Sequence, residues 1–295
     1  MASPTASDDI VVDIPPIIRV YKNGTVERPL QTPYVPPSLH DPQTGVSSKD
    51  VVISDNPCIS ARLYLPKSTD KKLPILVYFH GGGFLFESAF SRLYHNYLTS
   101  FVSQVNVVVV SVEYRLAPEH HLPAAYDDGW DAMKWVASAG GNIVYNMAMR
   151  AGAEDLPGGV RILGAICVHS YFYSSKPVGR EPVSGHEQSM SYLVWNFVYP
   201  SAPGGIDNPL MNPRAPGAPS LAGLACSKIL VCVASEDWIR ERGVWFYEGV
   251  KESGWKGKLE LFEQEGEGHI YHLLEPESEN GKRMTKRIAS FIMEN

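Results

Sequence analysis

The sequence has few cysteines, no long hydrophobic run and no excess of positive charge. Its four cysteines, Cys58, Cys167, Cys226 and Cys232, show no Cys-x-x-Cys pair and no metal-ligand spacing, so Cys167 and Cys232 are expected to be buried free thiols. No apolar run reaches transmembrane length, and the N-terminus lacks the basic and apolar segments of a secretory signal. The net charge of −6 gives no reason to expect nucleic acid as a partner. We therefore expect a cytoplasmic protein with no nucleic-acid partner and no membrane partner.

The chain of 295 residues is long enough to bury a sizeable core, and its hydrophobic fraction of 44% is ordinary for a globular protein. Residues 1–16 are expected to be disordered, and 17–295 to form one domain. An Asn-Gly pair at Asn23 and Gly24 predicts a hairpin over 17–28. Further along, strand-like and helix-like segments alternate, which predicts an α/β fold with a mostly parallel sheet behind an antiparallel opening.

The expected strands after the hairpin cover 49–53, 59–66, 75–79, 107–113, 162–169, 228–234 and 258–263. The expected helices cover 91–104, 123–136, 143–151, part of 183–199, 244–253 and 283–293.

A glycine loop follows the buried strand Ile75–Phe79, in the motif H-G-G-G-F that begins at His80. Three glycines allow positive φ angles and let backbone N–H groups approach a ligand closely. Such a loop suits an oxyanion hole, in which main-chain donors hold developing negative charge. The alternative is a tight turn at the end of a strand.

Two candidate catalytic residues follow the last two strands. Asp237 comes directly after 228–234 and His269 shortly after 258–263, so both are expected at the carboxyl edge of the sheet, where α/β folds bind ligands. An acid followed by a histidine, with a serine upstream, is the chain order of an α/β-hydrolase triad. Asp237 could instead be a helix N-cap, and His269 an ordinary loop histidine. His272 adds a second histidine but no third ligand accompanies the pair, so we expect no metal and no cofactor.

The motifs H-G-G-G-F, Y-R-L-A-P-E-H-H-L-P-A-A-Y-D-D, S-A-G-G-N-I, A-S-E-D and G-E-G-H together resemble the hormone-sensitive-lipase branch of the α/β-hydrolases. Within that branch the chain is most similar to plant carboxylesterases, including those that act as 2-hydroxyisoflavanone dehydratases. The resemblance covers the chain from about Ile17 to its end and implies an α/β-hydrolase fold. It also implies roles for nine residues: Ser138 as nucleophile, Asp237 as acid, His269 as base, the N–H groups of Gly82, Gly83 and Ala139 as oxyanion hole, and His80, Gly81 and one of Asp127 and Asp128 as supports.

The sequence departs from that family at the nucleophile. The family pattern is G-x-S-x-G on a sharp turn between a strand and a helix, whereas Val136 stands two residues before Ser138. The residues that lead to Ser138 have a helical pattern, and no apolar strand separates them from it. We therefore expect one central strand of the sheet to be missing, which leaves a gap or makes the strand 162–169 pair in its place.

The resemblance implies a carboxylic-ester hydrolase that acts on small or aromatic esters. A lid is expected from about 17–45 and 183–205, with an apolar surface supplied by Tyr192, Trp195, Phe197 and Tyr199. Three alternatives stay open: a dehydratase of hydroxylated phenolic compounds, a small-molecule binder like the gibberellin receptors, and a catalytically inactive isoform. Receptors of that kind lack the catalytic histidine, so His269 argues against the second. A monomer or a homodimer is expected.

Overall fold

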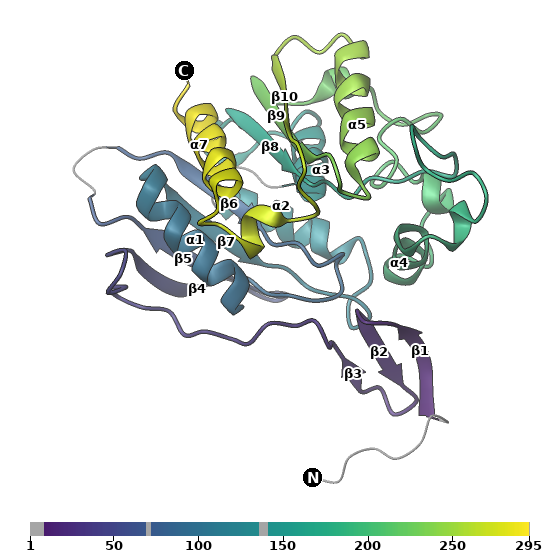
Figure 1. Ribbon diagram of the computed structural model, residues 1–295, viewed down its shortest axis with the longest axis horizontal. Helices are drawn as coiled ribbons and strands as arrows, with labels where there is room; N and C mark the ends of the chain where they lie inside the picture. The colour runs from purple at the N-terminus through teal and green to yellow at the C-terminus, as the bar shows by residue number, and fades with distance from the viewer. Residues whose placement is uncertain (1–8, 69–71, 136–140, 295) are drawn as a thin grey trace.

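The computed structural model of the protein describes residues 9–68, 72–135 and 141–294 (Figure 1). The strands are β1 (Ile10–Ile14), β2 (Ile18–Tyr21), β3 (Val26–Glu27), β4 (Ser47–Asp55), β5 (Cys58–Leu65), β6 (Ile75–Phe79), β7 (Val108–Glu113), β8 (Gly164–Val168), β9 (Lys228–Ala234) and β10 (Lys258–Gln264). The α-helices are α1 (Arg92–Val105), α2 (Ala124–Trp135), α3 (Gly141–Arg150), α4 (Met190–Val198), α5 (Arg240–Glu252), α6 (Tyr271–Leu274) and α7 (Glu279–Met293). Short 3₁₀ turns lie at Pro157–Gly159, His186–Gln188, Gly205–Asp207 and Leu221–Gly223.

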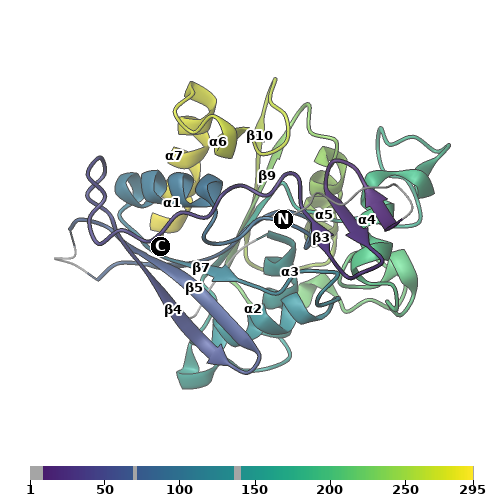
Figure 2. The ribbon, with the colours of Figure 1, turned by 90° about the horizontal axis from the view of Figure 1, so that it is seen from below.

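The first three strands form a small antiparallel sheet of their own, in the order β1-β2-β3. The predicted hairpin is confirmed, with Val20 opposite Val26 across the turn at Gly24. The prediction of disorder up to residue 16 is wrong for its last part, because β1 pairs with β2 along its length. The small sheet lies beside α4 (Figures 1 and 2).

A four-stranded sheet follows, in the order β4-β5-β7-β6. β4, β5 and β7 are antiparallel neighbours, whereas β6 runs parallel to β7 with Ile75 opposite Val108. The valine run of β7 is buried on both faces, as the sequence predicts for a central strand. β6 is therefore one edge of this sheet.

The last three strands form a separate parallel sheet in the order β10-β9-β8. Among the described strands, β8 pairs with β9 and does not pair with β6, so the strand 162–169 does not take the place of the strand that is expected to be missing. The missing strand itself stays a prediction. β9 is the central strand, and six of its seven residues are buried.

Helices cover both faces of the two sheets. α1, α6 and α7 lie together on one face, and α2, α3 and α5 lie on the other (Figure 2). Three helices begin earlier than the sequence predicts, and the first of them is α3, which begins at Gly141. α5 begins at Arg240, and α7 begins at Glu279 because the Ser278 hydroxyl caps it by accepting a hydrogen bond from Gly281 N.

Apolar side chains from all these elements form the core. Cys167 and Cys232 are buried, and neither forms a disulfide with a described residue, as predicted. In the described part of the chain, no helix combines the length and the apolar character that a membrane span requires.

Candidate active site

The glycine loop after β6 has a backbone that only glycine tolerates at its centre. Gly82 has a φ of +116°, and a Cβ atom there would lie 2.0 Å from the carbonyl oxygen of Phe86. Gly81 N donates a hydrogen bond to the Tyr94 hydroxyl over 2.8 Å. No described residue accepts a hydrogen bond from Gly82 N or Gly83 N. Both glycines line a cavity.

His80 supports this glycine loop through hydrogen bonds and a ring contact. Its Nδ1 donates a hydrogen bond to Gly81 O over 2.8 Å, and its ring stacks on Tyr114 with 4.2 Å between ring centroids. The Tyr114 hydroxyl donates to His80 O over 2.6 Å. Burial lowers the pKa of His80 to about 4, so its ring is neutral near pH 7.

Asp127 and Asp128 differ completely in their surroundings. Asp127 is exposed on α2 and forms an ion pair with Arg150 over 3.1 Å. Asp128 is fully buried, and its carboxylate accepts hydrogen bonds from the backbone N and the guanidinium of Arg115. By holding Arg115, Asp128 also fixes the preceding residue Tyr114, which supports His80.

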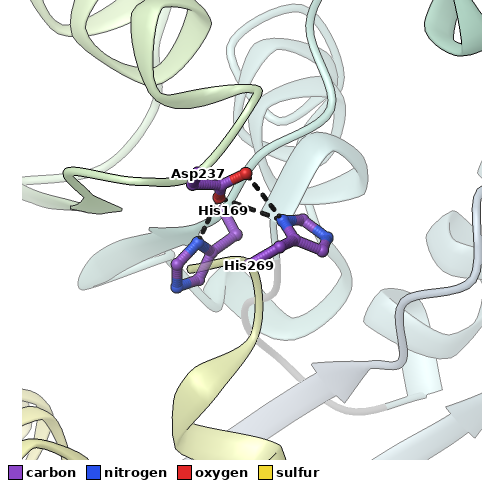
Figure 3. Close-up of side chains that lie close together, drawn as sticks. All are labelled: His169, Asp237 and His269. Atoms are coloured by element: carbon purple, nitrogen blue, oxygen red, sulfur yellow. Dashed lines mark hydrogen bonds and ion pairs between the residues drawn. The ribbon is translucent and has the colours of Figure 1, made fainter. Parts of the chain in front are cut away.

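The structure brings Asp237 and His269 together, as the sequence predicts. His269 Nδ1 lies 3.0 Å and 3.1 Å from the two carboxylate oxygens of Asp237 (Figure 3). Asp237 follows β9 and is buried, whereas 37% of the His269 side chain is exposed, after β10. A carboxylate that accepts from Nδ1–H fixes the tautomer in which Nε2 can accept a proton.

A second histidine, His169, also binds Asp237 and was missed by the sequence reasoning. Its Nδ1 lies 2.6 Å from Asp237 Oδ2, on the other side of the carboxylate from His269 (Figure 3). His169 follows β8 and has a φ of +44°. Its ring stacks on the ring of His272, and no described contact joins the His272 ring to Asp237. A signal for it existed, because the predicted strand 162–169 ends at this histidine on the same edge of the sheet as Asp237.

The electrostatics of the cluster keep Asp237 ionised. Burial alone raises the pKa of Asp237, but the hydrogen bonds from His169 and His269 outweigh burial and hold the pKa well below its usual range. Burial lowers the pKa of His169, so a neutral ring there donates to the carboxylate without adding a charge.

These groups open onto one cavity of about 620 Å³. Its polar end carries Gly82, Gly83, His169 and His269, and the rest of its lining is mainly apolar. Ligand cavities in proteins typically measure about 300–1,000 Å³, so this one has room for a small organic molecule.

The expected lid is wrong in its details. Residues of both segments do line the cavity: Ile17, Leu30 and Thr32, and Met190, Ser191 and Val194. The four aromatic residues of the prediction are not among the described lining residues. Trp195 is fully buried instead, and its indole N–H donates to Gly205 O over 2.9 Å. Tyr192, Trp195 and Phe197 on α4, and Tyr199 directly after it, pack toward the core.

The predicted nucleophile Ser138 and the predicted oxyanion donor Ala139 lie outside the described residues, in the segment 136–140 between α2 and α3.

One group of described residues has the composition of a metal site. Ligand atoms of His169, Asp237 and His269 all lie within 4.8 Å of one another. Their separations of 2.6–3.1 Å are those of hydrogen bonds from Nδ1–H to a carboxylate, which already account for the cluster.

Comparisons with known proteins identify the family of this chain. A family model described as the alpha/beta hydrolase fold matches residues 76–273. The chain belongs to the α/β-hydrolase family. A second model, that of the carboxylesterase family, matches 31–120, so this α/β hydrolase is carboxylesterase-like.

Similar proteins include plant enzymes and archaeal esterases. The α/β hydrolase is 55% identical to a 2-hydroxyisoflavanone dehydratase of Glycyrrhiza echinata, over 99% of this chain and 98% of that protein. It is 48% identical to a 2-hydroxyisoflavanone dehydratase of Glycine max, over 97% and 99%. Among solved structures it is similar to an esterase of the archaeon Pyrobaculum calidifontis, with 28% identity, a TM-score of 0.66 and coverage of 83% and 84%.

The alignments also show a difference in length. The alignment with the Glycyrrhiza echinata protein spans 323 positions, although it includes 99% of this chain of 295 residues. The alignment with the Glycine max protein spans 316 positions and includes 97% of this chain. In each case about 30 positions of the relative have no counterpart in this α/β hydrolase.

Proposed function

We propose that this chain is a carboxylic-ester hydrolase in which Ser138 is the nucleophile, His269 the general base and Asp237 the acid. The observation that carries the proposal is the pair of Asp237 and His269, which opens onto the same cavity as the glycine loop. A serine hydroxyl is a poor nucleophile unless a neutral imidazole takes its proton. His269 is arranged for that task, because its Nδ1 is engaged by Asp237 and its Nε2 is left to accept.

In the proposed reaction, Ser138 Oγ attacks the ester carbonyl and its proton passes to His269 Nε2. The N–H groups of Gly82, Gly83 and Ala139 stabilise the negative charge on the carbonyl oxygen. The alcohol then leaves with the proton from His269. Water attacks the acyl-enzyme, His269 again acts as base, and the carboxylic acid is released. His80 and Asp128 position the loop and do not touch the substrate.

The cavity favours small or aromatic esters, because its lining beyond the polar end is mainly apolar. The proposal needs no cofactor. It concerns a small-molecule substrate, and the cytoplasmic location and the monomeric or dimeric state stay predictions from the sequence.

Hydrolysis by this chain is expected to be slow. The segment 136–140 follows α2 directly, so no described strand leads to Ser138. A displacement of about 1 Å in a catalytic group costs about 100-fold in rate, and we expect at least that loss relative to an α/β hydrolase with an intact nucleophile turn.

A second candidate function is dehydration of a 2-hydroxyisoflavanone, favoured by the names of the two plant relatives. In this reaction His269 would remove the proton next to the substrate carbonyl, and the glycine loop would hold the enolate. The hydroxyl group would then leave as water when the double bond forms. No covalent bond to Ser138 is needed.

Turnover of p-nitrophenyl acetate and of a 2-hydroxyisoflavanone, by the unaltered chain and by Ser138→Ala, separates the candidates. Ester turnover that Ser138→Ala abolishes supports the hydrolase. Dehydration that survives Ser138→Ala supports the dehydratase. Turnover of neither substrate by folded protein refutes both and leaves the binder and the inactive isoform.

A further inference from the structure

The carboxyl group of Glu113, the last residue of β7, lies against the turn that follows the glycine loop. Its Oε2 accepts hydrogen bonds from the Ser88 hydroxyl over 2.8 Å and from Ala89 N over 2.6 Å. This turn is tied to the glycine loop in its own right, because Leu85 N donates to Gly82 O over 3.0 Å. Glu113 therefore fixes the segment that leads away from Gly82.

The same carboxyl group also faces the start of the glycine loop. Glu113 Oε2 lies 4.0 Å from Nε2 of His80, whose side chain is fully buried. No described residue forms a hydrogen bond with that nitrogen. The other ring nitrogen, Nδ1, donates to Gly81 O, so the neutral ring offers Nε2 as an acceptor. A buried acceptor normally has a donor, and a protonated carboxyl group is a donor.

The surroundings of Glu113 favour its protonated form. Burial raises the pKa of Glu113 to about 7 and outweighs the hydrogen bonds from Ser88 and Ala89, which lower it. The carboxyl group is thus a neutral donor below about pH 7 and a carboxylate above it. Burial lowers the pKa of His80 to about 4, so its ring leaves the proton on Glu113.

Two charged residues of the neighbouring strands act on Glu113 from a distance. Arg62 on β5 lowers the pKa of Glu113, and Asp50 on β4 raises it. These two residues form an ion pair with each other over 2.6 Å, so their effects on Glu113 oppose one another.

Glu113 also lines a second cavity, of about 500 Å³, and 28% of its side chain is exposed. Tyr114 lines it too, but its hydroxyl donates to His80 O. The other ionisable side chains of this cavity are Arg28, Cys58, Glu87, Arg115, Glu119 and His120. None of them makes a described hydrogen bond or ion pair with Glu113. The ring of His80 is therefore the titratable group that Glu113 faces most directly among the described residues.

We propose that Glu113 is a positioning residue of the oxyanion hole. Its carboxyl group accepts hydrogen bonds from the turn after the glycine loop and, when protonated, donates one to His80 Nε2 at the start of that loop. The separation of 4.0 Å is about 1 Å longer than an N···O hydrogen bond, so a shift of that size in the carboxyl group completes the contact. One group then holds the backbone on both sides of Gly82 and Gly83. Glu113 does not touch the substrate, and the role rests on the proposed function.

The charge on Glu113 makes this role depend on pH. An ionised Glu113 presents a second acceptor to the His80 Nε2 lone pair, so the contact with the loop is lost. It also adds a negative charge beside a loop that has to stabilise an oxyanion. The kcat for ester hydrolysis is therefore expected to fall as the pH rises through about 7.

Two substitutions separate this role from simple packing. Glu113→Gln keeps an oxygen that accepts from Ser88 and Ala89 and adds an NH₂ group that donates at every pH, so it copies the protonated carboxyl group. Glu113→Met has a similar length but offers no donor and only a weak acceptor. Glu277→Gln is the matched control, because Glu277 is exposed before α7 and pairs with Lys282.

The first readout is turnover of p-nitrophenyl acetate by the full chain. At about pH 6, Glu113→Met should lower kcat at least tenfold and change KM less than threefold, because the oxyanion forms only in the transition state. Glu113→Gln should keep kcat within threefold at that pH and lose the fall in kcat above about pH 7. The control should match the unaltered chain. The proposal is overturned if folded Glu113→Met keeps more than a tenth of kcat, or if the fall persists in Glu113→Gln.

A second readout needs no hydrolysis and serves also if Glu113→Met does not fold. In protein with isotope-labelled histidine, the nitrogen NMR signal of His80 Nε2, identified by its loss in His80→Asn, reports hydrogen bonding at this atom. The signal should move as the pH rises through about 7 in the unaltered chain and stay constant in Glu113→Gln. A constant signal in the unaltered chain, or equal movement in both proteins, overturns the proposal. If the unaltered chain does not turn over the ester, the proposed function fails, and the signal still decides whether Glu113 holds His80.

Discussion

Replacement of Asp237 by asparagine is expected to lower kcat for ester hydrolysis by about 10⁴-fold, the loss typical of this change in serine hydrolases. The carboxylate accepts Nδ1–H of both His169 and His269. An asparagine offers one oxygen and one NH₂ group, so one of the two imidazoles faces a donor. If that imidazole is His269, its proton moves to Nε2 and the base is lost. The factor corresponds to about 5.5 kcal/mol of transition-state stabilisation.

The same variant is expected to be less stable. Hydrogen bonds to a charged group contribute about 1.5–3 kcal/mol each. The Asp237 carboxylate accepts from three donors, His169, His269 and the backbone N of Ile239, while its side chain is 1% exposed. We expect a loss of about 2–4 kcal/mol at pH 7. Because the folded state holds the pKa of Asp237 below its unfolded value, this contribution is present above about pH 4 and is lost as the pH falls further. The difference between the two proteins should therefore shrink in acid.

The assay is p-nitrophenyl acetate turnover, with urea unfolding at pH 7 and in acid. Asp127→Asn is the matched control, because Asp127 is exposed and pairs only with Arg150 among the described residues. It should change kcat less than twofold and the free energy of unfolding by at most about 0.5 kcal/mol. The reasoning is refuted if Asp237→Asn keeps more than a tenth of the activity while folded, or if the control loses as much.

Three further predictions concern the supports of the site. Gly82→Ala places a Cβ atom 2.0 Å from a backbone oxygen and should lower fluorophosphonate labelling at least 100-fold, whereas Gly24→Ala, with nothing within 4 Å, should leave labelling unchanged. Asp128→Asn leaves the Arg115 guanidinium without its buried partner and should cost about 3–5 kcal/mol in urea unfolding; a loss under about 1 kcal/mol would contradict that role. Burial raises the pKa of Glu113 to about 7, so its folded carboxyl holds a proton that the unfolded one releases, and stability should fall by about 1–3 kcal/mol as the pH rises from about 4.5 to 7. Glu113→Gln should remove this slope, and an unchanged slope would contradict the assignment.

The parts of the site that depend on strand ends could be predicted from the sequence. Apolar runs located the strands before His80, Asp237 and His269, and the carboxyl ends of parallel strands meet at one edge. The tight glycine loop could also be predicted, because its conformation depends on residues that are close together in the sequence.

Features that depend on distant contacts could not be predicted. β1 forms because β2 offers it a partner, although its own sequence is short and lies near the N-terminus. His169 joined the site only once Asp237 was placed beside it. Trp195 looked like part of a lid but is buried, because the helical period of α4 turns it toward the core. The motifs predicted that a central strand is missing, but whether 162–169 would pair in its place depended on packing across both faces, and among the described strands β8 does not pair with β6.

Labelling of the folded chain with a fluorophosphonate, followed by mass spectrometry of its peptides, tests the proposed nucleophile most directly. A covalent adduct on Ser138, absent from Ser138→Ala and at least 100-fold slower in Asp237→Asn, is the result that the Ser138–His269–Asp237 mechanism predicts. Folded protein that carries no adduct, or an adduct on another residue, would contradict it.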